Sequence, residues 1–422
     1  MNAIGIDLGT TSICAVAIDI DTGAVLKSKT VSSNAFISTP NPWERVQDVS
    51  AIINIATSLA EEFIDENTCV IGVTGQMHGI VYVDKNGKAV SNLYTWQDAR
   101  GNLPYGETTY AKHLDSFAGY GNVTDFYNKI NGLRPESAVS YCTVHDYLVM
   151  TLCGLTSPVI HTTDAASFGC FDIEKNTFNY DLDVKVTGGF DIAGEYRGIP
   201  VGVAIGDNQA SVFSSVSSDD DILLNVGTGS QVSVISATPV TGENIEARPF
   251  FDGKYLLCGA ALCGGRAYSV LKDFYSAVLS AAGVENADVY AVMDKMLENV
   301  TESLNVDTRF EGTRKNPALS GSISGIRTDN FTPAQLTLGF LEGMVEELYS
   351  MYLQTEQKNG FIVGSGNGVR KNPQLVAAAE RKFGSKMKIP VHLEEAAYGA
   401  AMYGLVACGK FTCDEVRKLI KY

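Results

Sequence analysis

Two short segments of the sequence combine glycine with small hydroxyl side chains directly after an apolar run. They read Gly-Thr-Thr-Ser at residues 9–12 and Gly-Thr-Gly-Ser at residues 227–230. Glycine permits turns whose consecutive backbone N–H groups stay exposed, and the hydroxyl groups add further donors. Such turns can hold phosphate oxygens without a lysine. The residues expected to contact phosphate are Gly9, Thr10, Thr11, Ser12, Gly227, Thr228 and Gly229.

An acidic residue stands just before the first turn. Asp7 lies near the end of the apolar run of residues 3–8. A carboxylate placed there costs free energy to bury unless it has a partner, and it could hold Mg²⁺ directly or through water. The chain has neither a P-loop pattern nor a G-x-G-x-x-G followed by an acid roughly 20 residues on. P-loop and dinucleotide sites are therefore disfavoured.

The two turns belong to an internal repeat. Residues 4–18 and 222–236 align without a gap, so that Gly9 falls on Gly227 and Thr10 on Thr228. Both copies predict a strand, a Gly-Thr turn and a second strand. We interpret this as a duplicated domain, with ranges 1–218 and 219–422 divided at a polar break; the alternative is a chance similarity.

The first range predicts an α/β architecture. Residues 3–8, 13–18 and 24–30 are expected to form successive strands, followed by a helix over residues 48–64 and a buried strand over residues 69–73. Apolar residues recur at helical spacing in residues 48–64 and run continuously through residues 69–73. Strands and helices mixed in this order are typical of α/β domains.

A third glycine-rich segment reads Val-Gly-Ser-Gly-Asn-Gly at residues 363–368, before a helix expected to start near Asn372-Pro373. Bare backbone at such a junction could lie against a planar base, and a plain tight turn is an equal alternative.

Three more segments place polar groups at the ends of apolar strands, namely residues 74–79, 94–100 and 205–210. Ligands of α/β sheets gather at such ends. Together the segments supply an aromatic ring, an imidazole, amides and carboxylates. This mixture suits a sugar, which presents C–H groups beside neighbouring hydroxyls.

These motifs carry a family resemblance. IDLGTTS, NVGTGS and GSGNG resemble the phosphate and adenosine motifs of the actin-like ATPase superfamily, and GQMHG, WQDAR and GDNQA resemble the FGGY carbohydrate kinases, closest to their sedoheptulokinase and xylulokinase branches. The resemblance implies an α/β, two-domain duplicated actin-like (ribonuclease H-like) fold, with mixed sheets flanked by helices and a central cleft. Thr313 departs from the family pattern, which usually has Glu there.

Carried over by position, the resemblance implies roles for individual residues. Asp207 matches the catalytic base and Asp7 the acid associated with Mg²⁺. ATP and Mg²⁺ are the expected cofactors. The expected sugar contacts are Gln76, Met77, His78, Trp96, Asp98, Asp207 and Asn208, and the expected adenosine contacts are Gly364, Gly366 and Asn367.

Each of the principal residues has a structural alternative. Asp207 could cap the following helix, because Asp is a favoured N-cap. His78 could be a satisfied structural histidine, and Met77 and Trp96 could be core residues. Asp98 and Arg100 could form an internal ion pair that holds their loop.

The resemblance implies ATP-dependent phosphorylation of a ketose, with sedoheptulose first, giving the sugar phosphate and ADP. Xylulokinase or another FGGY pentulose or polyol kinase is the alternative within the family. A non-kinase actin-like ATPase or an ATP-binding sugar sensor is the alternative from another class.

Composition excludes several other classes. The chain has 422 residues, 45% of them hydrophobic, and a net charge of −16. Nucleic-acid binders normally present a basic face, which is missing here. The nine cysteines show no C-x-x-C, so reduced thiols are expected. We predict a cytoplasmic protein with sugar and ATP as small-molecule partners, no nucleic acid and no membrane; a homodimer stays open.

Overall fold

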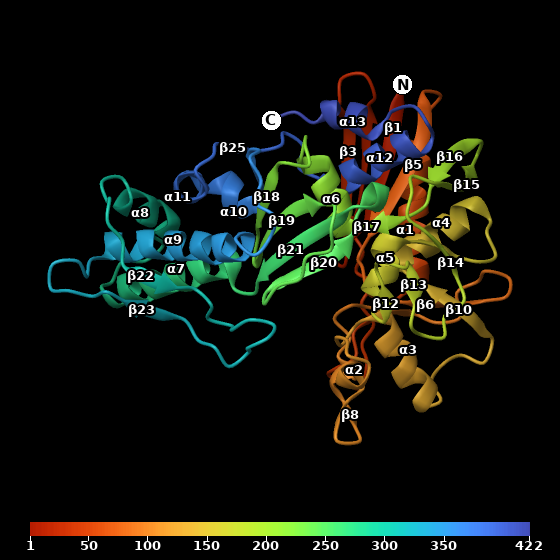
Figure 1. Ribbon diagram of the computed structural model, residues 1–422, viewed down its shortest axis with the longest axis horizontal. Coiled ribbons are helices and arrows are strands. Elements are labelled where there is room, and N and C mark those ends of the chain that lie inside the picture. The colour runs from red at the N-terminus through yellow and green to blue at the C-terminus, as the bar shows by residue number, and fades with distance from the viewer. The chain divides into compact units, whose positions relative to one another are not determined.

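The computed structural model describes all of residues 1–422 and has a mixed α/β architecture (Figure 1). The chain forms two compact units, which we describe separately. The first contains Met1–Ser215, Arg248–Lys254 and His392–Lys421. The second contains Val216–Ala247, Tyr255–Val391 and Tyr422.

A mixed sheet forms the centre of the first unit, with strand order β15-β16-β5-β1-β2-β3 and β17 paired to β5. Strand β1 pairs antiparallel with β2 and parallel with β5. Residues on β1, β2 and β5 are almost all buried, as their apolar runs predicted. The strands are β1 (Asn2–Leu8), β2 (Ser12–Asp19), β3 (Val25–Ser32), β5 (Thr68–Gly75), β15 (Ile192–Tyr196), β16 (Ile199–Gly202) and β17 (Ile205–Gly206).

Short two-stranded ladders accompany this sheet. They are β4 (Val46–Gln47) with β7 (Leu93–Tyr94), β6 (Val81–Asp84) with β10 (Ala138–Cys142), β8 (Pro104–Tyr105) with β9 (Thr108–Thr109), β11 (Val159–His161) with β14 (Lys185–Thr187), and β12 (Phe171–Asp172) with β13 (Thr177–Phe178).

The second unit is built on a sheet of order β20-β21-β19-β18-β24-β25, with a separate ladder of β22 and β23. Strand β18 pairs antiparallel with β19 and parallel with β24, which repeats the pairing of β1 with β2 and β5. This common topology confirms the duplicated fold. The strands are β18 (Ile222–Val226), β19 (Ser230–Ser236), β20 (Ile245–Pro249), β21 (Tyr255–Ala261), β22 (Asn305–Asp307), β23 (Ser322–Ser324), β24 (Ile362–Ser365) and β25 (Met387–Lys388).

The helices begin at the polar residues that the sequence offers. Asp48 accepts from the backbone N–H groups of Ser50 and Ala51 and so caps α1, and Asn372 caps α11. In the first unit the helices are α1 (Val49–Phe63), α2 (Tyr110–His113), α3 (Gly121–Ile130), α4 (Val144–Cys153), α5 (Thr162–Ser167), α6 (Asp207–Ser215), α12 (Glu395–Ala407) and α13 (Cys413–Val416). In the second they are α7 (Gly264–Ala281), α8 (Val289–Met296), α9 (Pro333–Tyr352), α10 (Gly366–Lys371) and α11 (Pro373–Phe383).

The sequence-based ranges differ from the structure at two segments of the second range, because residues 248–254 and 392–421 group with the first unit. The larger segment carries α12, which packs on β1, β5 and α6. The approach is close because glycine lies beneath the helix. A Cβ atom on Gly5 would overlap the carbonyl oxygen of Ala397, and one on Gly72 would overlap that of Ala400.

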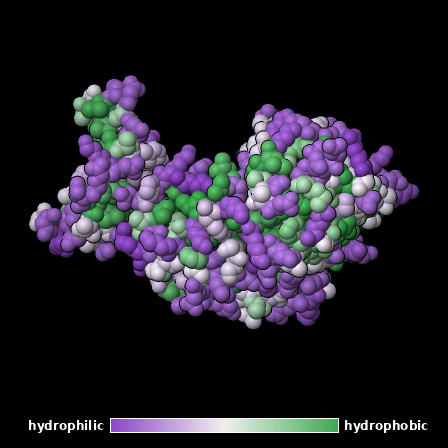
Figure 2. All heavy atoms as spheres, turned by 90° about the horizontal axis from the view of Figure 1, so that it is seen from above, coloured by the Kyte–Doolittle hydropathy of each residue, from purple (hydrophilic) through white to green (hydrophobic).

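The face in Figure 2 is mostly hydrophilic, with hydrophobic residues in groups among the polar ones. No helix combines the length and the apolar character that crossing a membrane requires. All nine cysteines are free thiols, as expected from their spacing.

We predict that Gly72→Ala lowers the free energy of unfolding by about 1–3 kcal/mol, because α12 must move away from β5. Urea unfolding measures this. The matched control is Gly189→Ala, where the nearest atom to a new Cβ would be Asp191 Oδ2 at 3.3 Å. Equal stability of the two variants would contradict the close packing of α12.

Candidate active site

Two carboxylates end strands on either side of β5. Asp7 lies opposite Thr74 in the β1–β5 register, and Asp207 directly follows Gly206, which lies opposite Gly75. The carboxyl ends of parallel strands meet at one edge of a sheet, where ligands of α/β folds bind. Sequence separation of these residues is large, but the sheet brings them to the same edge.

Burial raises the pKa of both carboxyl groups. The pKa of Asp7 rises to about 7, chiefly through burial and then through the charge of Asp207. The pKa of Asp207 rises to about 6, again chiefly through burial, while the charge of His145 lowers it. The Oδ1 atom of Asp7 is buried without a hydrogen-bond partner. An acid left in this state favours a bound cation.

The backbone around Asp207 is held by hydroxyl groups. Thr74 Oγ1 donates to the carbonyl oxygen of Ile205 at 2.7 Å, and the Gly206 N–H donates to Thr163 Oγ1 at 3.0 Å. Asp207 is the first residue of α6. Arg248 Nη1 donates to Asn208 Oδ1 at 3.2 Å. No sequence pattern pointed to Arg248, because only folding brings it to α6.

His78 follows β5 in a strained turn. Its φ is 72°, which a non-glycine residue adopts only when its surroundings fix it. Its Nδ1 lies 2.8 Å from the carbonyl oxygen of Ser167, and its ring stacks on Tyr120 at 4.3 Å. Met77 is buried, and its thioether would meet a Cβ on Gly206 at 2.8 Å. Met77 thus adjoins the segment that carries Asp207, while His78 is held by Ser167 and Tyr120.

A hydrogen-bond network joins the first glycine turn to the predicted sugar segments. The Trp96 indole N–H donates to Thr10 Oγ1 at 2.9 Å, and Thr10 Oγ1 donates to Gln76 Oε1 at 3.3 Å. Gln47 Nε2 donates to the Thr10 carbonyl oxygen at 2.6 Å and completes the network. Trp96 is 46% exposed, so it is not the core aromatic that was the alternative.

Asp98 forms an internal ion pair with Arg100, which was the structural alternative to a sugar contact. Arg100 Nε donates to its Oδ1 at 2.7 Å, Arg100 Nη2 to its Oδ2 at 3.1 Å, and the backbone N–H of Arg45 to its Oδ2 at 3.0 Å. Asp98 and Arg100 are each only 1% exposed. These bonds favour the internal ion pair over a contact with sugar.

In the second unit the repeated turn, Gly227–Gly229, joins β18 to β19. The Gly265 N–H donates to the Gly227 carbonyl oxygen at 3.1 Å, and the Arg266 N–H to that of Thr228 at 3.0 Å. A side chain on Gly265 would overlap the Gly227 carbonyl oxygen. The start of α7 thus supports the turn. The Gly264-Gly265 pair at the start of α7 was the signal for this contact, and the sequence reasoning missed it.

The third glycine segment lies beside the second turn. Asn225 Nδ2 donates to Ser365 Oγ at 3.1 Å, and a Cβ on Gly368 would meet the Val226 carbonyl oxygen at 2.7 Å. Gly366 has a φ of 84° and starts α10, and Asn367 is exposed. Gly364 is buried in β24 under Met387.

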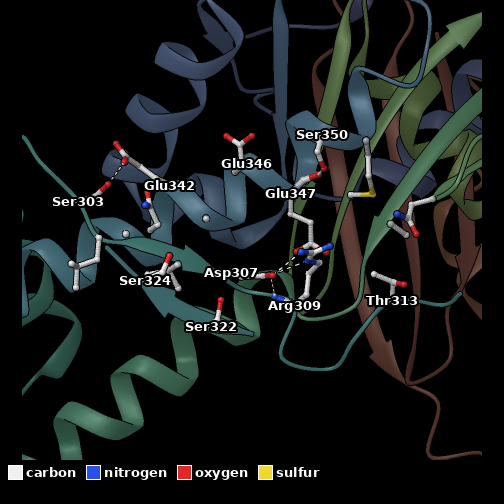
Figure 3. A pocket seen from close by; sticks show the side chains of 18 residues that line it. Ser303, Asp307, Arg309, Thr313, Ser322, Ser324, Glu342, Glu346, Glu347 and Ser350 are labelled. Atoms are coloured by element: carbon white, nitrogen blue, oxygen red, sulfur yellow. Dashed lines mark hydrogen bonds and ion pairs between the residues drawn. The ribbon is translucent and has the colours of Figure 1, made fainter. Parts of the chain in front are cut away.

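A cavity of about 520 Å³ lies elsewhere in the second unit, beside α9, β22 and β23 (Figure 3). Asp307 and Arg309 form an ion pair in its wall, and Thr313 also lines it. Burial raises the pKa of Glu347, another lining residue, to about 7. None of the predicted sugar or nucleotide residues lines this cavity.

Sequence reasoning also missed a buried charged group behind β5. His145 and Asp164 are both fully buried, with His145 Nε2 3.1 Å from Asp164 Oδ1. Burial works to lower the pKa of His145, but the charge of Asp164 outweighs it and the pKa rises to about 9. No sequence pattern singled out His145.

The fold defines a class of protein first. The xylulose kinase structure from Rhodospirillum rubrum superposes with a TM-score of 0.84, covering 100% of this chain and 93% of that chain at 18% identity. The fold is therefore that of the FGGY sugar kinases, within the actin-like ATPase fold.

Sequence comparison then gives the family. Residues 2–105 match the N-terminal domain of the FGGY family of carbohydrate kinases. Human sedoheptulokinase is 30% identical over 469 residues, covering 94% of this chain and 96% of that protein. Gluconokinase from Bacillus licheniformis is 23% identical, covering 98% and 89%. The chain belongs to the FGGY family and is a carbohydrate kinase, a phosphotransferase.

We predict that Asp98→Asn destabilises the protein by about 3–5 kcal/mol, because the buried Arg100 guanidinium loses its counter-charge. The folded fraction should keep its KM for sugar. Thermal unfolding and steady-state kinetics measure the two effects. Asp172→Asn, which breaks the exposed pair with Lys175, is the control and should change neither. A large rise in the sugar KM without loss of stability would instead make Asp98 a sugar contact.

Proposed function

We propose that this carbohydrate kinase transfers the γ-phosphoryl group of ATP to a hydroxyl group of a ketose, and that sedoheptulose is its preferred substrate. The support for this sugar is the similarity to human and mouse sedoheptulokinase, 30% and 28% identical over almost their whole lengths. Xylulose and gluconate kinases are similar at lower identity.

The observation that carries the mechanism is the pair of carboxylates at the ends of the two strands beside β5, Asp7 on β1 and Asp207 directly after β17. Asp207 is proposed as the base. The sugar oxygen forms a bond to the γ-phosphorus, the bond from that phosphorus to the β–γ bridging oxygen breaks, ADP leaves, and the hydroxyl proton passes to Asp207. Gln76, Met77, His78, Trp96 and Asn208 are proposed to orient the sugar.

Asp7 is proposed to hold Mg²⁺. The fit rests on its unpartnered buried Oδ1 and on the excess of carboxylates around it, since Asp207 and Glu394 both raise its pKa. When bound, Mg²⁺ would neutralise charge on the phosphate oxygens. Carboxylate oxygens are its usual protein ligands.

The two glycine turns are proposed to hold the phosphates through backbone N–H groups, aided by Thr10, Thr11, Ser12 and Thr228. Gly366 and Asn367 are proposed to contact the adenosine. Gly364 is buried beneath Met387, so its proposed contribution is to let the segment pack closely rather than to touch the base.

A substrate panel tests the sugar assignment. We expect kcat/KM for sedoheptulose to exceed that for xylulose, ribulose, gluconate and glycerol by about tenfold or more, because loss of a sugar hydroxyl leaves polar groups of the site unpaired. ADP release with saturating ATP and Mg²⁺ measures it. A higher kcat/KM for xylulose or gluconate would move the assignment to that branch of the family.

A second prediction tests the base. Asp207→Asn should lower kcat by about 10²–10⁴-fold with the fold intact, because no carboxylate then accepts the hydroxyl proton. Asp181→Asn, at a side chain that is 99% exposed, is the control. More than about a tenth of the wild-type kcat in Asp207→Asn would contradict the role, since general-base loss costs more than that.

The same role fixes the sign of the pH dependence. Only the ionised Asp207 accepts a proton, and burial places its pKa at about 6. The kcat of the wild type should therefore fall as the pH is lowered through about 6. A kcat that stays constant well below this pH would count against Asp207 as the base.

A further inference from the structure

A buried ion pair between His145 and Asp164 lies near the two proposed active-site carboxylates and forms no hydrogen bond with either of them. His145 stands in the first turn of α4 and Asp164 in α5, both with no exposed surface. Their Nε2 and Oδ1 atoms are 3.1 Å apart. A buried ion pair seldom adds stability over apolar residues of the same volume, because both charges lose their hydration. Its presence therefore calls for another reason.

The position of His145 supplies a reason for the ion pair. A Cβ atom on Gly75 would lie 2.9 Å from His145 Nδ1, so the ring packs against the last residue of β5. Gly75 pairs with Leu8 on one side and with Gly206 on the other. Asp7 precedes Leu8 and Asp207 follows Gly206, so the imidazole is one residue removed in register from each carboxylate.

The charges agree with this placement. His145 is the one cationic group whose charge lowers the pKa of both Asp7 and Asp207. Asp164 and Asp146 in turn favour the charged imidazole, which burial alone would discharge. Asp146 is itself held in place, because it accepts from Thr143 in the capping box of α4.

We propose that His145 is a positioning residue: a buried cation, anchored by Asp164, that packs against the last residue of β5 and stabilises negative charge on Asp207. This rests on the proposed role of Asp207. The pair has no exposed surface, so it acts through Asp207 and not by touching a ligand. Gly75 is required because any side chain there would displace the ring.

The test compares loss and retention of the positive charge. His145→Gln removes it, and His145→Lys keeps a cation beside Asp164. We expect His145→Gln to lower kcat by about tenfold or more with little change in the sugar KM, since a nearby opposite charge commonly favours an ionised carboxylate by that factor or more. His145→Lys should restore most of the kcat.

Asp164→Asn provides a second route if the lysine variant fails to fold, and it should lower kcat in the same way. Its matched control is Asp125→Asn, which removes a charge that is equally buried. Asp125 accepts from Tyr82 and Tyr180 and pairs with Lys129, away from β5. This control should lower the melting temperature and leave kcat unchanged.

The outcomes separate this inference from the proposed function. An unchanged kcat in His145→Gln or in Asp164→Asn, measured while Asp207→Asn is inactive, would overturn the positioning role alone. Equal impairment of folded His145→Lys and His145→Gln would overturn it too. Full activity of Asp207→Asn would overturn the base and this inference together.

Discussion

The burial of charge at the end of β5 is the constraint on which the first unit depends. Asp7, Asp146, Asp164 and Asp207 gather around a single imidazole, and burial raises the pKa of Asp7, Asp146 and Asp207. Carboxylates are not buried in this number unless cations oppose them. His145 supplies one such charge, and the proposed Mg²⁺ would supply more. Several contacts keep the carboxylates and the imidazole in place. They come from Gly75, from the hydroxyl groups of Thr74 and Thr163, and from the capping box of α4.

The second unit has the same strand topology but presents different chemical groups at the corresponding turn. Its turn at Gly227–Gly229 repeats the one at Gly9–Ser12, but Asn225 replaces the acid and pairs with Ser365. The main chain of α7 supports this turn through Gly265 and Arg266. One copy of the duplicated fold thus concentrates carboxylates at its sheet edge, while the other offers mostly backbone. This division suits a reaction in which a base acts on a hydroxyl group and phosphates must be held.

Much of this could be predicted from the sequence. Asp7 and Asp207 stand at the ends of apolar runs, and Asp48 caps the start of α1, so local signals suffice for these residues. Residues that act through distant contacts could not be found in this way. His145, Asp164 and Arg248 come to the sheet edge from three separate elements, and α12 joins the first unit only because Gly5 and Gly72 admit it. An ion pair of Asp98 with Arg100 was one of the predicted alternatives, since the two residues are close in sequence. Only the packed structure shows that both carboxylate oxygens of Asp98 accept hydrogen bonds.

The charge on His145 can be measured directly, by NMR titration of the imidazole resonances with His145→Gln used for assignment. The chain has only five histidines, so the signals are few. The account predicts that His145 is protonated at neutral pH and loses its proton near pH 9, because Asp164 outweighs the cost of burial. A neutral His145 imidazole at pH 7 in the folded enzyme would contradict the account.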